Sequence, residues 1–465
     1  MKIAMILLSA MAVTLLSCKG EWLSRIGGQG KLLAPHWKEA ELPNKAKGVV
    51  YEDHSVPIIY YRAVIRSGSA AEPPDKPGLA NLTGELLLRG TKSHTRDEIF
   101  SQLEGMGATL EVETSYDFLS YSGSVLSKNK DRFLKILAEI LIQPTFPAEE
   151  LTKLRHEVMA QIQEQLDKDR EVVNLHFRRA LFGDHPYSRP VLGTPQSIPN
   201  ITLTDIMTFY RENFVSGNMI LESAGDISKG DAINDFELLF AGLPPGEMRQ
   251  SQYGEFKPTE QNRVFLIDKP QRTQTQIMIG QVGIPANDPD YIPLTVMSTA
   301  FGGTFTAPLN DEIRIKRGWS YGAFSYLRSW KDPGFFAMWT FPANKDTVPA
   351  IELALDLYRR FIDKGVKENE FTHATEHLVN SYPFDWDTPG DILSLATQRI
   401  IFDLPRDYYL TYTDRIRGLQ LQSAHEILKR RLRKEPLTIA IVCDAKDFFQ
   451  KVSAFGQVAV RRYDE

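Results

Sequence analysis

An internal repeat constrains the fold most strongly, because the chain runs twice through one order of predicted elements. Each half opens on an apolar run typical of a β-strand, at 58–65 and again at 275–282. A Gly/Pro turn, amphipathic helices and a closing strand with an acidic turn follow in both halves. A period of about 200 residues is too long for a solenoid and indicates a duplicated domain of the α+β class.

The repeat also predicts where the two domains begin and end. Helices are predicted at 130–142 and 350–363, and the closing strands at 219–226 and 437–444. Residues 244–261 are polar and rich in Pro, Gly and Gln, which is typical of a linker. We therefore expect domains at 46–243 and 262–465, each an antiparallel-dominated sheet with helices packed on one face.

The start of the chain resembles a bacterial export signal with a lipidation site. Lys2 precedes an apolar run from Ile3 to Leu16, which is too short for a comfortable transmembrane helix and has the length of a signal-peptide core. The run ends in Leu-Leu-Ser-Cys, similar to a lipobox. We expect residues 1–17 to be removed, Cys18 to carry lipid and residues 18–45 to form a tether. A plain signal peptide with an incidental cysteine is the alternative.

The N-terminal segment predicts where in the cell the protein is located, and the net charge predicts which classes of partner it can bind. Lys19 follows the cysteine, and by resemblance to lipoproteins of two-membrane bacteria this residue permits sorting to the outer membrane. We expect an exported, periplasm-facing lipoprotein whose membrane contact is the lipid anchor alone. The chain has 54 Lys and Arg against 59 Asp and Glu, a formal net charge of −5. Nucleic-acid binding usually requires a basic face, so no nucleic-acid partner is expected.

A series of motifs runs in a fixed order through almost all of the chain after residue 46. The first half contains GSAAEPPDKPGLANLTGELLLRGT at 68–91, GMGA at 105–108, QPTF at 143–146, HPYSRPVLGT at 185–194 and FYRENF at 209–214. The second half contains GG at 302–303 and LNDEIRIKRGWSY at 309–321. Together they resemble the insulinase, pitrilysin and mitochondrial processing peptidase family of inverted-zinc-motif peptidases. The resemblance implies two homologous domains that form half of a clamshell.

The metal motif of that family is degenerate in this chain. Active members carry H-x-x-E-H on a helix, where the histidines bind zinc and the glutamate activates the metal-bound water. The matching pentad here is NLTGE at 81–85, so Asn81 and Glu85 replace the histidines and Gly84 replaces the glutamate. Gln161 falls at or near the third-ligand position, and a neutral amide is a weak zinc ligand. The resemblance implies no zinc and no catalytic residue of this chain's own.

A literal H-x-x-E-H does occur elsewhere, formed by His373, Glu376 and His377 on a helix predicted over 368–379. Imidazoles one turn apart can share a zinc ion. The internal repeat, however, aligns this helix with 149–161 and not with the helix of the zinc motif. No third ligand can be identified, so a polar, solvated face is favoured and a self-sufficient zinc peptidase using these residues is the alternative.

The second half keeps Arg314 and Tyr321, which match the Arg/Tyr pair of the family. In family members this pair reaches across the closed shell to the scissile peptide bond. Arginine and a phenol can donate hydrogen bonds to a carbonyl oxygen as it becomes an oxyanion. A chain that lost zinc but kept the pair resembles the non-catalytic subunits of two-gene members, and a packing or salt-bridge role for the pair is the alternative.

The expected function is that of a non-catalytic, substrate-binding subunit of a heterodimeric zinc peptidase, inactive alone. The partner would be a homologous subunit that carries the zinc, and the substrate a peptide or unfolded polypeptide. A strand near 109–114 lies where family members pair a substrate by β-strand addition, although an ordinary interior strand fits equally. A binding or scaffold lipoprotein without any enzyme role is the further alternative.

Overall fold

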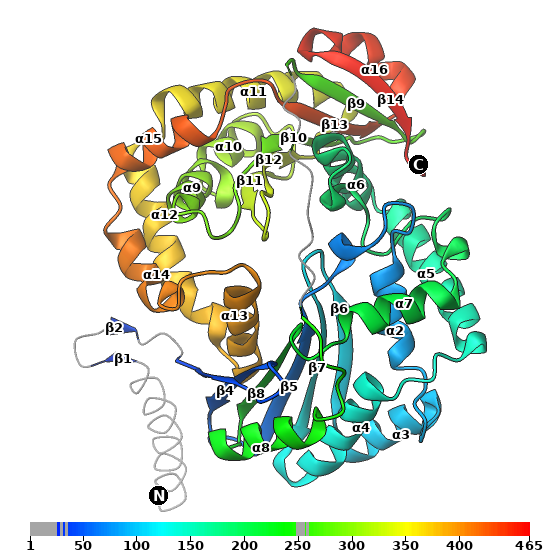
Figure 1. Ribbon diagram of the computed structural model, residues 1–465. Helices are drawn as coiled ribbons and strands as arrows, with labels where there is room; N and C mark the ends of the chain where they lie inside the picture. Colours follow the sequence, from blue (N-terminus) through cyan, green and yellow to red (C-terminus); the bar gives the residue numbers. More distant parts are fainter. Residues whose placement is uncertain (1–25, 28–30, 33–35, 248–255, 257–259) are drawn as a thin grey trace, which may run out of the picture.

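The computed structural model describes residues 26–27, 31–32, 36–247, 256 and 260–465 (Figure 1). The predicted signal peptide, Cys18, most of the tether and most of the linker lie outside the described residues. A short antiparallel pair, β1 (Ile26–Gly27) and β2 (Lys31–Leu32), precedes the main body. None of the helices that the structure describes has the length and apolar content needed to span a membrane.

Among the described residues, each half of the chain contains one six-stranded sheet (Figure 1). The first has the order β3-β4-β8-β5-β7-β6 and is antiparallel except for the β4–β8 pair. Its strands are β3 (Lys38–Glu41), β4 (Lys47–Glu52), β5 (Ile58–Ile65), β6 (Thr109–Thr114), β7 (Leu119–Leu126) and β8 (Met219–Gly225). Because β6 forms the edge, an interior position for the strand near 109–114 is wrong.

The second sheet has the order β11-β12-β10-β13-β9-β14, with β9 parallel to both of its neighbours and the other pairs antiparallel. Its strands are β9 (Arg263–Asp268), β10 (Gln276–Val282), β11 (Ala323–Arg328), β12 (Phe335–Thr340), β13 (Thr438–Cys443) and β14 (Gln457–Arg462). The predicted α+β class and the duplicated, antiparallel-dominated sheets are confirmed.

The helices follow the same order in both halves. The first half contains α2 (Leu79–Leu87), α3 (Arg96–Met106), α4 (Lys130–Ile142), α5 (Ala148–Asp167), α6 (Asp169–Phe182), α7 (Leu203–Asn213) and α8 (Lys229–Leu239). The second contains α9 (Tyr291–Ser298), α10 (Pro308–Asn310), α11 (Thr347–Lys364), α12 (Glu368–Ser381), α13 (Pro389–Ile401), α14 (Tyr408–Arg417), α15 (Leu421–Arg431) and α16 (Ala445–Val452). Two π-helical segments, Thr299–Gly303 and Asp311–Lys316, flank α10.

One helix of each half packs on the sheet of the other half. The teal-green α6 packs on β9, β10 and β13, while the orange α13 packs on β4, β5 and β8 (Figure 1). The two helices hold the same place in the repeat, directly after α5 and α12. Helices of the same half therefore cover one face of each sheet, and the other half covers part of the second face. This explains why β8 and β13 are buried along their whole length and consist largely of apolar residues.

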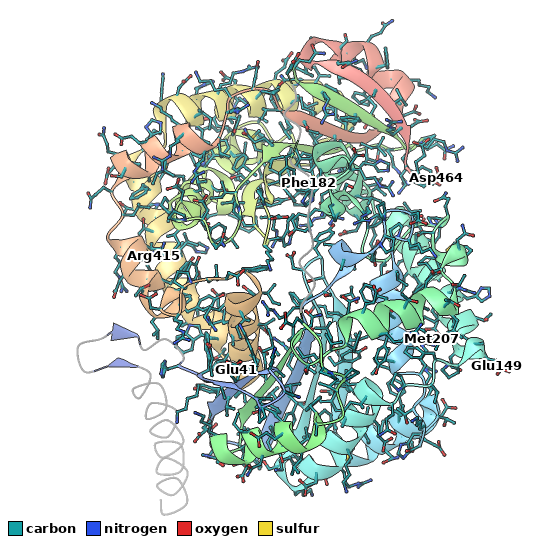
Figure 2. All side chains as sticks on the ribbon, in the orientation of Figure 1. Glu41, Glu149, Phe182, Met207, Arg415 and Asp464 are labelled. Carbon is teal, nitrogen blue, oxygen red and sulfur yellow. The ribbon has the colours of Figure 1, made fainter. Side chains whose placement is uncertain are left out.

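The first sheet takes in part of the segment that the sequence assigns to the tether. Strand β3 pairs with β4, and Figure 2 marks its last residue, Glu41. Before the strand, the Trp37 ring lies edge-on to Tyr409, with centroids 6.1 Å apart. Within the strand, Glu39 forms an ion pair with Arg399 of α13. The folded body thus begins before residue 46, and its first strand contacts both halves.

A polar network lies in the interface between α13 and the first sheet. Arg62 of β5 donates from Nε to Ser122 Oγ at 2.9 Å and from Nη2 to Ser394 Oγ at 3.0 Å. Thr397 Oγ1 donates to Glu222 Oε2 at 2.9 Å. Burial raises the pKa of the Glu222 carboxyl to about 7, although Arg62 and Thr397 act in the opposite direction. The contact between the halves therefore contains a buried acid that titrates near neutrality.

The titration of Glu222 predicts that the chain loses stability as pH rises. The folded-state pKa lies above the ordinary value of 4.5, so the stabilising contribution is complete below pH 4.5 and is lost as pH rises through 7. Glu222→Gln should flatten this decline by up to about 3 kcal/mol, since one pKa unit corresponds to about 1.4 kcal/mol. Urea unfolding between pH 4.5 and 8 measures it. The exposed Glu104→Gln is the control and should keep the wild-type slope.

Candidate functional site

Helix α2, which carries the degenerate pentad, is held at its start by a buried carboxylate. Gly78 precedes the helix with φ 97°, a left-handed conformation that favours glycine. The Glu72 carboxylate accepts hydrogen bonds from the N–H groups of Gly78, at 3.1 Å, and Ala80, at 2.7 Å. Burial raises the pKa of Glu72 to about 8. A side chain from outside the helix thus caps its free N–H groups.

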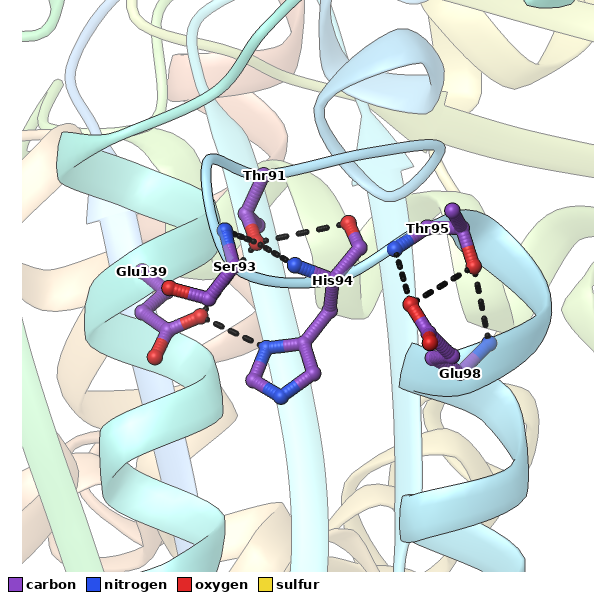
Figure 3. A network of polar contacts seen from close by, with 6 residues as sticks. All are labelled: Thr91, Ser93, His94, Thr95, Glu98 and Glu139. Carbon is purple, nitrogen blue, oxygen red and sulfur yellow. Dashed lines mark hydrogen bonds and ion pairs between the residues drawn. The ribbon is translucent and has the colours of Figure 1, made fainter.

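The loop after α2 is fixed by a second polar network (Figure 3). Thr95 and Glu98 form a capping box: the Thr95 N–H donates to Glu98 Oε2 at 2.8 Å and the Glu98 N–H donates to Thr95 Oγ1. Glu139 of α4 lies 2.8 Å from His94 Nδ1 and accepts from Thr91 Oγ1 at 3.2 Å. Both ends of α2 are therefore fixed in place, so the position of the pentad is well defined.

The pentad of α2 lies in packed core. Asn81 and Gly84 are both buried. A Cβ atom added at Gly84 would lie 2.7 Å from Leu119 Cδ1 and 3.1 Å from Val112 Cγ2, so a larger residue here would displace buried side chains of β6 and β7. The Tyr121 hydroxyl donates to the Gly84 carbonyl at 2.9 Å. The position that the motif aligns with the general base of the family is thus crowded by apolar side chains of the neighbouring strands.

The other two positions of the degenerate site do not restore a metal-binding set. Glu85 is half-buried, and desolvation raises its pKa. Arg89, one turn later, forms a two-pronged contact with Glu157 of α5, with N–O distances of 3.1 and 2.5 Å. Gln161, one turn beyond Glu157, has an exposed side chain. Zinc is usually bound by four ligands drawn from imidazole, thiolate and carboxylate groups. This set offers the acid Glu85 and the neutral amides of Asn81 and Gln161, so it does not fit a zinc ion.

The literal H-x-x-E-H pentad lies on the outer face of α12. His373, Glu376 and His377 are exposed, whereas Phe371 and Ala374 form the buried face of the helix. Within the described ranges, no group of three or more His, Cys, Asp or Glu side chains is placed to hold a metal ion. Helix α12 follows α11 as α5 follows α4, so it occupies the place that the repeat predicts.

Arg314 and Tyr321 lie on a different part of the second domain, and no residue in the described part of the chain forms a hydrogen bond or ion pair with their side chains. Arg314 belongs to the π-helical segment 311–316, and its guanidinium lies over the Phe305 ring, 5.2 Å from the centroid. Tyr321 follows the segment and is 78% exposed. The carboxylates nearby are engaged by other residues, because Glu312 pairs with both Lys316 and Arg317. The pair can therefore donate to a ligand without first breaking an ion pair.

Some residues of interest were not identifiable from the sequence. Arg170 of α6 lies over the Trp339 ring of β12, 4.2 Å from its centroid. Likewise, Glu222 and Thr397 meet in the interface between the halves. Each pair joins positions more than 150 residues apart, and no motif in one half indicates the contact. The only available signal was the repeat, which places α6 and α13 in equivalent positions.

Two models of one peptidase family match consecutive stretches of the chain. Residues 48–195 match "Insulinase (Peptidase family M16)" and residues 200–378 match "Peptidase M16 inactive domain". Together the two segments take in more than half of the chain. The chain belongs to the insulinase family of peptidases, as its motifs predicted.

Individual relatives agree with this assignment. The chain is 25% identical over 412 residues to "Non-peptidase homolog YmxG" of Helicobacter pylori, covering 87% of this chain and 93% of the relative. It is 23% identical over 401 residues to "Probable mitochondrial-processing peptidase subunit beta" of Arabidopsis thaliana, covering 84% and 73%. A solved peptidase M16 inactive domain from Pseudomonas fluorescens has a TM-score of 0.82 at 24% identity, covering 88% and 97%. This structural likeness shows the fold.

Substitutions at two glycines test whether the pentad is packed core. Gly84→Ala should lower the free energy of unfolding by up to about 2 kcal/mol, because the overpacking of the new methyl group against Leu119 and Val112 outweighs the gain of about 1 kcal/mol in helix propensity. Gly84→Glu should lower it further. Gly105→Ala in α3 is the matched control: nothing lies within 4 Å of its Cβ position, so it should gain up to about 1 kcal/mol of helix propensity. Chemical denaturation measures all three. A Gly84→Glu protein as stable as wild type would show that the site is open.

Proposed function

We propose that this chain is the non-catalytic, substrate-binding subunit of a heterodimeric zinc peptidase in the bacterial cell envelope. The observation that carries the proposal is the contrast between two places on the molecule. At Gly84 the site of the general base is filled by core side chains, whereas Arg314 and Tyr321 keep unused donors. A chain selected for self-sufficient hydrolysis would need the first site, and a subunit that assists a partner needs only the second.

The proposed role of the pair is to orient the substrate and to stabilise developing charge. A homologous partner subunit supplies the zinc and the general base. The Arg314 guanidinium and the Tyr321 phenol then donate hydrogen bonds to the carbonyl oxygen of the scissile bond as it gains negative charge. Members of this family work as heterodimers of homologous subunits, and the Arabidopsis relative is itself named as a subunit.

The edge of the first sheet supports the binding of an extended polypeptide. Among the described strands, β6 pairs with β7 alone. Thr109, Glu111 and Glu113 are exposed along it, while Leu110 is buried on the opposite face of the strand. Main-chain groups at such an edge can add a peptide as a further strand. The substrate class we propose is therefore a peptide or unfolded segment of a polypeptide.

The proposed location rests on the first residues of the sequence. Cleavage after residue 17 and lipidation of Cys18 would leave a chain that is held to the periplasmic side of the outer membrane by lipid. The first described strand of the main body, β3, starts at Lys38 and contacts both halves. The tether would therefore enter the folded body at the junction between the two domains and not at the end of one of them.

Reconstitution with a homologous subunit that carries an intact H-x-x-E-H tests the proposal. The mixture should cleave an unstructured polypeptide that neither chain cleaves alone. Arg314→Gln and Tyr321→Phe should each lower kcat by about 100-fold or more, the usual effect of losing one oxyanion donor. Arg317→Gln, directly after the same segment, is the matched control, because Arg317 is already bound to Glu312. Steady-state cleavage of a fluorogenic peptide measures these rates.

Two other outcomes would replace the proposal. If a stable complex forms but cleaves nothing, or cleaves equally well with Arg314→Gln, the chain is a binding lipoprotein without an enzyme role. If the chain alone cleaves peptides and His377→Ala abolishes that activity, the exposed pentad of α12 is the active site.

A further inference from the structure

A row of aromatic rings leads away from Arg314 across the second sheet. Phe305 lies edge-on to Phe324 at 5.5 Å, Phe324 stacks on Trp339 at 6.0 Å, and Trp339 lies 4.8 Å from Phe341, all between ring centroids. Phe305 is 62% exposed and the other three rings are half-buried. We call these four residues the aromatic row. So much exposed ring surface beside a proposed substrate-orienting pair indicates a binding surface.

The aromatic row lies toward the edge of the second sheet, beyond the strands on which α6 mainly packs. Helix α6 packs mainly on β9, β10 and β13 and reaches β12 through Arg170 and Phe177, whereas Phe324 and Trp339 of the row belong to β11 and β12. Phe324 and Trp339 are directly opposite each other in the strand register. Tyr326 and Arg328 follow on β11 at alternate positions, so they share the face of Phe324. The surface therefore extends along β11 beyond the row itself.

Three arginines lie over rings of this surface and keep their hydrogen-bond donors free. Arg314 lies over Phe305, Arg170 over Trp339 at 4.2 Å, and Arg328 over Tyr326 at 5.6 Å. The described residues offer none of the three a hydrogen-bond or ion-pair partner. The neighbouring acid Asp169 is already engaged, in a pair with Lys269. Guanidinium groups held over rings with free N–H groups form a surface that favours a negatively charged ligand.

We propose that the aromatic row and its three arginines bind an extended, acidic peptide segment that carries aromatic side chains. The proposal rests on the function proposed above and names its substrate class. Same-face side chains of an extended peptide recur about every 7 Å, since each residue rises about 3.3 Å. Successive rings of the row lie 4.8–6.0 Å apart, which is shorter than this repeat, so the row offers room for two or three such side chains. Because Arg314 lies over Phe305 of the row and also belongs to the substrate-orienting pair, one continuous peptide can occupy both.

The β6 edge of the first sheet is acidic, whereas the surface on β11 and β12 is basic. This difference in charge gives the surface its selectivity. On β6 the exposed residues include Glu111 and Glu113, and Ser120 and Ser122 are their partners on β7. An acidic segment is repelled at that edge and attracted to Arg328 of β11 and to Arg170, so the part of the substrate that adds to β6 is a different, non-acidic segment from the part that binds the row. Aromatic and arginine side chains also stack on nucleobases. The peptide is favoured because the surface continues into the pair that would orient a peptide bond.

Peptide binding to the purified full chain in detergent tests the proposal. The probe is a fluorescein-labelled decapeptide that alternates Phe with Glu. One comparison peptide alternates Ser with Glu and the other alternates Phe with Lys. Fluorescence anisotropy should give the lowest Kd for the Phe/Glu peptide, with both comparison peptides weaker by about tenfold or more, and the Kd should rise with salt.

Arginine variants locate the site. Arg328→Gln and Arg170→Gln should each raise the Kd of the Phe/Glu peptide by about three- to tenfold. The matched control is Arg415→Gln: Arg415 is exposed on α14, labelled in Figure 2, and lies 5.4 Å above the Tyr408 ring, which is not part of the row. It should leave the Kd unchanged. The circular dichroism spectrum of each variant should match that of wild type. If Arg170→Gln unfolds the chain, Arg328→Gln alone still tests the site.

Four outcomes would overturn the proposal. These are the absence of binding, equal binding of all three peptides, equal weakening by Arg415→Gln, and displacement of the peptide by a single-stranded twelve-nucleotide DNA that binds more tightly. The assay uses the chain without a partner and leaves Arg314 and Tyr321 intact. Its failure is therefore distinguishable from a failure of partner-dependent cleavage, which the reconstitution measures separately.

Discussion

Each sheet has two apolar faces, and the helices of its own half cover only one of them. Helices α6 and α13 each pack on the second face of the sheet in the opposite half, and we call this the exchange of helices. The contact between the halves and the position of the proposed binding surfaces depend on it. Because apolar residues of the second sheet, such as Met278 and Val442, belong to the same core cluster as the first domain, the halves form one body. The same exchange leaves the β6 and β11 edges of the two sheets away from the main contacts of the exchanged helices. Function is therefore expected at these two edges.

The exchange of helices also brings polar and charged side chains of one half into contact with the sheet of the other half. Helix α13 brings Thr397 to the buried Glu222, and α6 carries Arg170 to the ring of Trp339. A buried acid in the first interface makes the contact between halves sensitive to pH. The second contact adds an unpaired guanidinium to an aromatic surface. Both effects arise from helices that originate in the opposite domain.

Much of the fold could be predicted from periodicity and turn residues. The helix predicted at 130–142 and the strand at 58–65 match α4 and β5 residue for residue, because amphipathic spacing and apolar runs are local signals. The edge strand β3 was not predicted, since the sequence of Lys38–Glu41 is polar and its pairing with β4 depends on tertiary contact. The exchange of helices could not be predicted either, because α6 and α13 have ordinary amphipathic sequences that do not specify which sheet they cover.

The candidate site was predictable only in part, for a related reason. Replacement of the metal motif can be read directly at Asn81, Gly84 and Glu85. The sequence does not reveal that Leu119 and Val112 fill the space beside Gly84, because that depends on how β6 and β7 approach α2. Nor does it reveal that Tyr321 is exposed or that Arg314 lies over Phe305. Motifs identify residues, whereas availability for a ligand is a property of the packing.

The central claim is that this chain holds no zinc site of its own. Metal analysis of the purified full chain, after equilibration with excess zinc and removal of free metal, tests it most directly. The account predicts a zinc content close to zero, unchanged by His377→Ala. A content of about one zinc per chain, lost in His377→Ala, would contradict the account and assign the metal to α12.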